Sequence, residues 1–114
     1  MADDAVYIDF TDGAKRVMNN SKLYVKLLTK FKNDTKLDDL EGAIAAGELE
    51  KARNAVHTIK GVAANLSLTE LHKQSLALEN QIKAGAAEPA QLDTVRTVFA
   101  KTLQEIDKVI TENG

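Results

Sequence analysis

Residues 49–66 read LEKARNAVHTIKGVAANL and contain the most regular apolar pattern in the chain. The apolar positions are separated alternately by three and four residues, which is the spacing of one face of an α-helix. The pattern therefore predicts a helix over residues 48–66 with one face buried. The residues of that face are Leu49, Ala52, Val56, Ile59, Ala63 and Leu66.

The segments on both sides of this helix repeat the same periodicity. No stretch alternates with a period of two for long enough to form a strand. We therefore expect helices throughout, and they are predicted over residues 20–33, 35–46, 67–84 and 89–112, with a short one between Ile8 and Met18.

Residues that are typical of helix ends support these boundaries. Gly47 and Gly85 each follow an apolar-periodic stretch, where a helix is expected to end. Pro89, the single proline, suits the first turn of the last helix. Asp34 or Thr35 is the expected N-cap of the helix that follows.

A capping box is predicted where the fourth segment begins. The run Ser67-Leu68-Thr69-Glu70 has a hydroxyl residue followed three positions later by a glutamate. Ser67 is therefore the expected N-cap of the helix over 67–84.

Several helices with short connections predict an all-α fold, an antiparallel four-helix bundle (up-down-up-down) with additional short N-terminal helices. The main helices are expected at 35–46, 48–66, 67–84 and 89–112, or with 20–33 in place of one of the shorter ones. The 114 residues suggest a single domain over 1–114.

Composition narrows the function classes. The formal net charge is −2 and there is no cysteine, so neither nucleic-acid binding nor disulfides are indicated. No apolar run approaches the roughly 20 residues of a membrane span, and the acidic N-terminus does not resemble a signal peptide. We expect a cytoplasmic monomer that binds neither nucleic acid nor membranes.

His57 stands one residue beyond the buried face, about 100° around the helix, so it is predicted to lie at the edge of the core with its ring exposed. Residues three and four positions away share its side of the helix. These are Arg53, Lys60 and Gly61, with Ala64 a turn further on. A nitrogen nucleophile, a cation and an unobstructed stretch of backbone therefore lie together, an arrangement suited to accepting a phosphoryl group. The alternative is a boundary histidine that only packs.

The motif His57-x-x-Lys60-Gly61, followed by small residues and Asn65-Leu66, resembles the histidine phosphotransfer (HPt) domains of bacterial phosphorelays. The resemblance extends over nearly the whole chain. It includes Ile8-Asp9-Phe10, Asn20, Leu23-Tyr24, Leu27-Leu28, Phe31, Ala46-Gly47-Glu48 and Leu78-Glu79. Ser67 is a departure, since many members carry glycine there, and we expect it to alter the turn without loss of activity.

The resemblance implies a four-helix bundle that exchanges phosphoryl groups with an aspartate of a response-regulator receiver domain. It makes His57 the phosphoacceptor, Lys60 the cation that stabilises phosphoryl charge, and Gly61 the residue that admits the partner closely. It further implies that Mg²⁺ is held by the partner receiver, and that a hybrid sensor histidine kinase lies upstream.

The remaining site residues have weaker indications. Arg53 and Ala64 are candidate partner-binding residues, although Arg53 has the default interpretation of a solvated charge. His72 lacks the Lys-Gly context and is expected to be a surface or boundary residue. No Gly-rich phosphate loop is present, so autonomous kinase activity and a cofactor of its own are not expected, and no metal site is indicated.

Two other interpretations stay open. The chain could be the phosphoacceptor domain of a chemotaxis-type histidine kinase, which receives its phosphoryl group from an ATP-bound catalytic domain. It could also be a helical docking module whose histidine is never phosphorylated. A metal-binding bundle is disfavoured because His57 and His72 are the only histidines.

Overall fold

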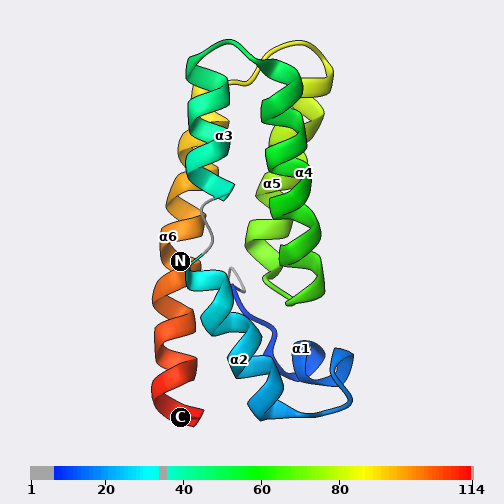
Figure 1. The fold of residues 1–114 in the computed structure, drawn as a ribbon, viewed down its shortest axis with the longest axis vertical. Helices are drawn as coiled ribbons and strands as arrows, with labels where there is room; N and C mark the ends of the chain where they lie inside the picture. The colour runs from blue at the N-terminus through cyan, green and yellow to red at the C-terminus, as the bar shows by residue number, and fades with distance from the viewer. Residues whose placement is uncertain (1–6, 34–35, 114) are drawn as a thin grey trace, which may run out of the picture.

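Six helices account for most of the chain in the computed structural model, which describes residues 7–33 and 36–113 (Figure 1). They are α1 (Phe10–Arg16), α2 (Ser21–Lys32), α3 (Lys36–Ala45), α4 (Leu49–Asn65), α5 (Thr69–Lys83) and α6 (Pro89–Asn113). Within these described ranges, no helix has both the length and the hydropathy that crossing a bilayer requires.

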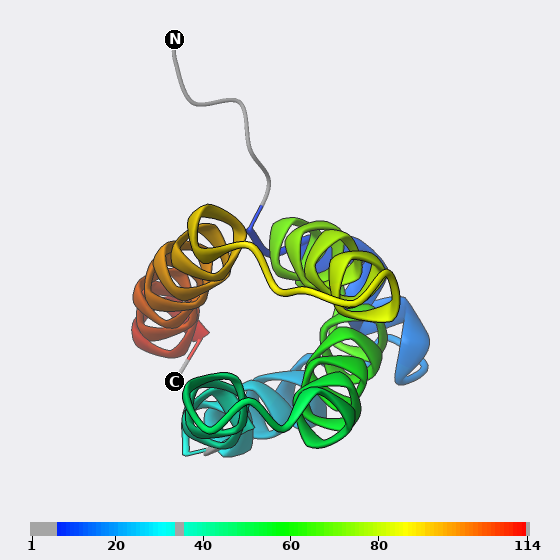
Figure 2. The same cartoon turned by 90° about the horizontal axis from the view of Figure 1, so that it is seen from above.

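The all-α bundle predicted from periodicity is confirmed. Helix α4 packs against α3 on one side and α5 on the other, and α5 packs against α6 (Figure 2). The fourth position is shared by two helices, because α3 and α2 follow one another along the same side of the bundle and α2 packs on α6 (Figure 1). The two alternatives for closing the bundle are therefore combined in the structure.

The core is built on the face of α4 that the sequence singled out. Ala52, Val56, Ile59, Ala63 and Leu66 are all buried, and Leu49 is half-buried. Each large aliphatic side chain removed from water contributes roughly 1.5–3 kcal/mol, so this face fixes the rotation of α4 in the bundle. That rotation in turn decides which side of α4 faces solvent.

Most helix ends agree with the predicted punctuation. Gly47 and Gly85 adopt left-handed φ angles of +73° and +112° just beyond α3 and α5. This conformation costs glycine little because it has no Cβ. Pro89 opens α6 as expected. The predicted N-cap at Asp34 or Thr35 lies outside the described residues.

The capping box predicted at Ser67 is wrong. Ser67 has a φ of +57° and ends α4 rather than starting α5, which begins at Thr69 with Leu68 as its N-cap. The amide of Ser67 donates to the Ala64 carbonyl at 3.2 Å, and that of Leu68 to the Ala63 carbonyl at 2.8 Å. These two bonds form a Schellman-type end of the right-handed helix α4. In this motif the residue at the position of Ser67 adopts a left-handed conformation and is usually glycine.

Candidate functional site

His57 occupies the solvent-facing edge of α4, as predicted. Its neighbour Val56 is completely buried, whereas 67% of the His57 side chain is exposed. The rotation of α4 that buries the apolar face therefore presents the imidazole outward. The ring can be approached from solvent while its backbone is fixed by the core.

A carboxylate from the neighbouring helix holds the ring. The Oε2 atom of Glu79 on α5 lies 2.8 Å from Nδ1 of His57. The other oxygen, Oε1, accepts a hydrogen bond of 2.7 Å from Nζ of Lys60. The side chain of Glu79 is only 2% exposed, so His57 and Lys60 are bridged by a carboxylate that lies on the buried side of both residues.

This contact determines which ring nitrogen is reactive. An ionised carboxylate only accepts hydrogen bonds, so Nδ1 of His57 must carry the hydrogen. In the neutral imidazole the other nitrogen, Nε2, then keeps its lone pair. The arrangement leaves Nε2 as the nucleophilic atom of an exposed ring.

Glu79 is ionised despite its burial. Burial alone would raise the pKa of this carboxyl, but hydrogen bonds from Lys60 and His57 outweigh it and hold the pKa below its ordinary value. The positive charge of Lys83, one turn further along α5, acts in the same direction. The cations around Glu79 therefore preserve the negative charge that orients the imidazole.

Lys60 lies on the predicted side of α4, but its ammonium is engaged. Its side chain is 21% exposed and points to Glu79 rather than standing free beside the ring. A buried carboxylate attracts the nearest cation strongly because water screens little there. Lys60 thus acts on His57 through Glu79 in the described state.

The other predicted residues line the same exposed side. Gly61 is exposed, and a Cβ built on it would meet nothing within 4 Å, so core packing does not require glycine there. Arg53 is exposed and Ala64 is half-buried. The surface of α4 next to His57 therefore has only small side chains at Gly61 and Ala64, and it is accessible to a partner.

Sequence reasoning missed the role of Glu79 beside His57. The signal was available in α5, where the inward positions Leu71, Leu78 and Ile82 share a face with Glu79. A glutamate at a core position needs a buried cation or donor as its partner. His72, by contrast, is half-buried, and its Nδ1 lies 3.3 Å from the backbone carbonyl oxygen of Lys60.

Comparisons with known proteins complete the description of the site. Neither the search of curated proteins nor that of solved structures found a match. The sequence model of the Hpt domain family matches residues 27–110, from the middle of α2 to near the end of α6. Because this match covers more than half of the chain, the protein belongs to the Hpt domain family.

Proposed function

We propose that His57 is a phosphohistidine carrier that accepts a phosphoryl group on Nε2 and exchanges it with a receiver-domain aspartate in two-component signalling. The observation that carries the proposal is the exposed imidazole whose Nδ1 is held by the buried Glu79 carboxylate. Membership of the Hpt family supports the same reaction class.

The transfer step follows from this geometry. The lone pair of Nε2 attacks phosphorus of an aspartyl phosphate, the N–P bond forms, and the P–O bond to the aspartate breaks. The aspartate leaves as a carboxylate, so no proton has to be moved. The ring becomes positively charged with its hydrogen still on Nδ1, and Glu79 stabilises that charge across the 2.8 Å contact. The reverse step returns the phosphoryl group to a receiver.

Lys60 supports this step in two ways. Its ammonium keeps Glu79 ionised. Because Lys60 lies three residues after His57 on the same side of α4, its charge also attracts the incoming phosphoryl oxygens. Charge on those oxygens dominates the transition state of phosphoryl transfer, so nearby cations lower the barrier. Mg²⁺ belongs, in this proposal, to the partner receiver.

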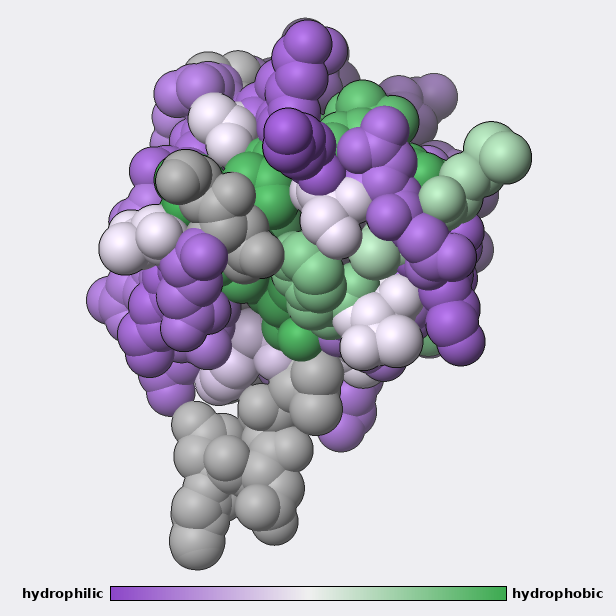
Figure 3. Space-filling view, turned by 90° about the horizontal axis from the view of Figure 1, so that it is seen from below, coloured by the Kyte–Doolittle hydropathy of each residue, from purple (hydrophilic) through white to green (hydrophobic). Residues whose placement is uncertain are grey.

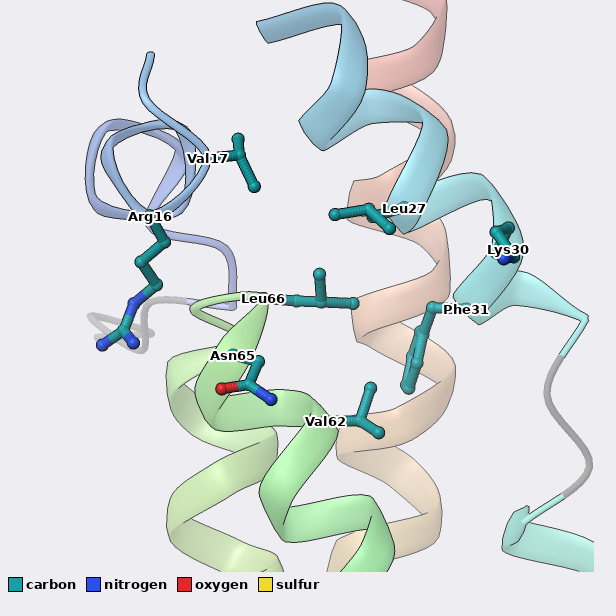
Figure 4. A pocket seen from close by; sticks show the side chains of 8 residues that line it. All are labelled: Arg16, Val17, Leu27, Lys30, Phe31, Val62, Asn65 and Leu66. Carbon is teal, nitrogen blue, oxygen red and sulfur yellow. The ribbon is translucent and has the colours of Figure 1, made fainter. Parts of the chain in front are cut away.

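The surface next to His57 provides a docking site. His57, Gly61 and Asn65 form one row along α4, each one turn from the next. The row ends at an apolar groove of about 720 Å³ (Figure 4). Its lining comprises Val17, Leu27, Phe31, Val62, Asn65 and Leu66, with Arg16 and Lys30 beside them. We propose that the receiver rests here while its aspartate reaches His57, with Arg53 and Ala64 at the margins of the contact.

The test is a pair of matched substitutions. His57→Gln is expected to abolish labelling by a phosphorylated receiver and by phosphoramidate, a small phosphodonor, because the nucleophile is gone. His72→Gln, which removes the other histidine, is expected to leave labelling unchanged. Circular dichroism establishes that both variants are folded. Labelling of His57→Gln at the wild-type level would refute the assignment and favour a docking module.

The identity of the donor is a separate question within the same proposal. A chemotaxis-type acceptor would be labelled by an isolated kinase catalytic domain with ATP, whereas a phosphorelay carrier would be labelled by phosphorylated receivers. The initial rate of labelling of the wild-type chain, measured with each donor in turn, distinguishes the chemotaxis-type acceptor from the phosphorelay carrier.

A further inference from the structure

Helix α1 is fastened to the turn that ends the histidine helix. The backbone amide of Asp9 donates to the Ser67 carbonyl at 2.9 Å. In the opposite direction, the Ser67 hydroxyl donates to Oδ2 of Asp12 at 2.5 Å. Two hydrogen bonds therefore connect the start of α1 to the single residue Ser67.

Aromatic packing reinforces this attachment. Phe10 of α1 packs edge-on against the ring of Tyr24, with 5.2 Å between centroids, and the Tyr24 hydroxyl donates to the Leu66 carbonyl. Gly13 permits the close approach, since a Cβ there would lie 2.2 Å from the Tyr24 ring. Helix α1 consequently has a defined position relative to the end of α4.

Asp12 connects Ser67 to Arg16. The same Oδ2 atom that accepts from Ser67 also accepts from Nε of Arg16, at 3.0 Å. The hydrogen bond from Ser67 and then that from Arg16 lower the pKa of Asp12, so the carboxylate stays charged. Arg16 makes this contact through Nε, and 51% of its side chain is exposed to solvent.

Arg16 lies where two features of the surface meet. It borders the apolar groove beside Val17, at the end of α1 (Figure 4). It also borders a smaller hollow that includes Ala64 and His72, and Ala64 shares the exposed side of α4 with His57. Lys30 stands on the other side of the groove. Two cations thus flank an apolar floor next to the phosphoacceptor helix.

The whole end of the molecule that carries α1 and α2 also has an apolar centre with a hydrophilic rim. Viewed from that end, apolar side chains gather in the centre and hydrophilic ones surround them (Figure 3). An occupant that matches this surface has an apolar ridge flanked by carboxylates. A receiver domain fits this description when a carboxylate at the edge of its contact surface, distinct from the aspartate that reaches His57, faces Arg16.

We infer that Arg16 is a recognition residue for a carboxylate of the receiver domain, and that Ser67 and Asp12 are the residues that position it. The inference rests on the proposed phosphotransfer function and adds a specificity determinant to it. It also gives Ser67 a role that glycine could not fill. Ser67 adopts a left-handed φ of +57°, a conformation that is unfavourable for a residue with a side chain. Its hydroxyl, which glycine lacks, donates the hydrogen bond to Asp12.

The contacts of Ser67 cross the boundary of the region that the family model matches. The family match begins at residue 27, after α1 and the first half of α2. The contacts among Ser67, Asp12 and Arg16 therefore join a residue inside the matched region to two residues before it.

The first test compares two charge reversals. The probe is the receiver domain that accepts label from His57 fastest in a panel of purified receivers, and its dissociation constant is measured by titration calorimetry. Arg16→Glu is expected to weaken binding roughly tenfold or more, as loss of a charge-assisted hydrogen bond would. Lys22→Glu changes net charge equally on an exposed position of α2 outside the groove, and is expected to change binding less than about twofold.

The second test examines positioning. Ser67→Gly preserves the left-handed turn but removes the hydroxyl, and is expected to weaken receiver binding several-fold. In an Arg16→Ala background the same substitution is expected to have no further effect, because its influence passes through Arg16. Additive losses in the double variant would overturn the positioning role of Ser67.

Phosphoramidate labelling separates this inference from the function on which it rests. Lys22→Glu, which changes a residue outside the groove, is expected to be labelled at the same rate as the wild type. Absence of labelling in every protein would refute the proposed function itself. Normal labelling together with equal receiver affinity for Arg16→Glu and Lys22→Glu would overturn the recognition role alone.

Discussion

Glu79 is the residue that orients the imidazole of His57. A carboxylate that is 2% exposed is unfavourable unless its hydrogen-bonding capacity is satisfied, and here one oxygen serves His57 while the other serves Lys60. The arrangement orients the imidazole without covering Nε2. In the proposed function, stability and reactivity are therefore coupled through the Glu79 side chain.

Glu79→Gln tests this coupling. The amide keeps the size of the side chain but loses its charge, and a neutral hydrogen bond is weaker by about 1 kcal/mol or more than a charge-assisted one. We expect phosphoramidate labelling of His57 to slow roughly tenfold, since 1.36 kcal/mol corresponds to tenfold in rate. Nitrogen NMR of the His57 ring should show loss of the preference for hydrogen on Nδ1.

Glu70→Gln is the matched control for that experiment, because Glu70 lies on the same helix and hydrogen-bonds Gln74 instead of His57. It is expected to leave both the labelling rate and the ring tautomer unchanged. An unchanged rate in Glu79→Gln would remove Glu79 from the mechanism.

At the scale of the element, the exposed side of α4 carries a glycine that weakens the helix. Glycine in an exposed helix interior costs about 1 kcal/mol relative to alanine, and nothing lies within 4 Å of a Cβ at Gly61. Gly61→Ala is therefore expected to raise the free energy of unfolding by up to about 1 kcal/mol. Gly61→Leu should weaken receiver binding about tenfold by obstructing close approach.

Gly42 offers the control, since it lies within α3 and is equally free of neighbours within 4 Å. Gly42→Ala is expected to stabilise the fold by a similar amount, as measured by urea unfolding, while Gly42→Leu leaves receiver binding intact. Equal affinities for Gly61→Leu and Gly42→Leu would contradict the close-approach role of Gly61.

The helices and the exposure of His57 were predictable because they follow from periodicity alone. An apolar repeat fixes the buried face of α4, and the residue next to it must then lie at the edge. The ending at Ser67 was not predictable in this way, because its conformation depends on bonds to Ala63 and Ala64 and on the contact with Asp12. The partnership of His57 with Glu79 likewise joins residues 22 positions apart on two helices.

For the whole molecule, the bundle divides stability and function between its parts. The core face of α4 holds α3 and α5 in place, while the solvent-facing edge of α4 carries His57. At the end of α4, α1 and α2 are attached through Ser67 and through the Tyr24 hydroxyl, which bonds the Leu66 carbonyl. The orientation of the groove thus depends on contacts that involve neither His57 nor Glu79.

The Tyr24 hydroxyl makes global stability sensitive to alkaline pH. Burial, followed by the negative charges of Asp9 and Asp12, raises the pKa of Tyr24 from 10.0 to about 12. The folded protein therefore keeps this proton in a range where the unfolded chain has lost it. The resulting stability is fully present below pH 10 and is lost as the pH rises toward about 12.

Tyr24→Phe should abolish this contribution. The variant is expected to be less stable than the wild type by about 1–2 kcal/mol at pH 8, because the Leu66 carbonyl loses its buried donor. Between pH 10 and 12 the difference should shrink, since only the wild type has a buried phenol to ionise. Urea unfolding at successive pH values measures both effects, and Tyr7→Phe, at the half-buried second tyrosine, controls for general alkaline loss. If wild type and Tyr24→Phe lost stability in parallel over that range, the proton on Tyr24 would not be what couples the end of α4 to the fold.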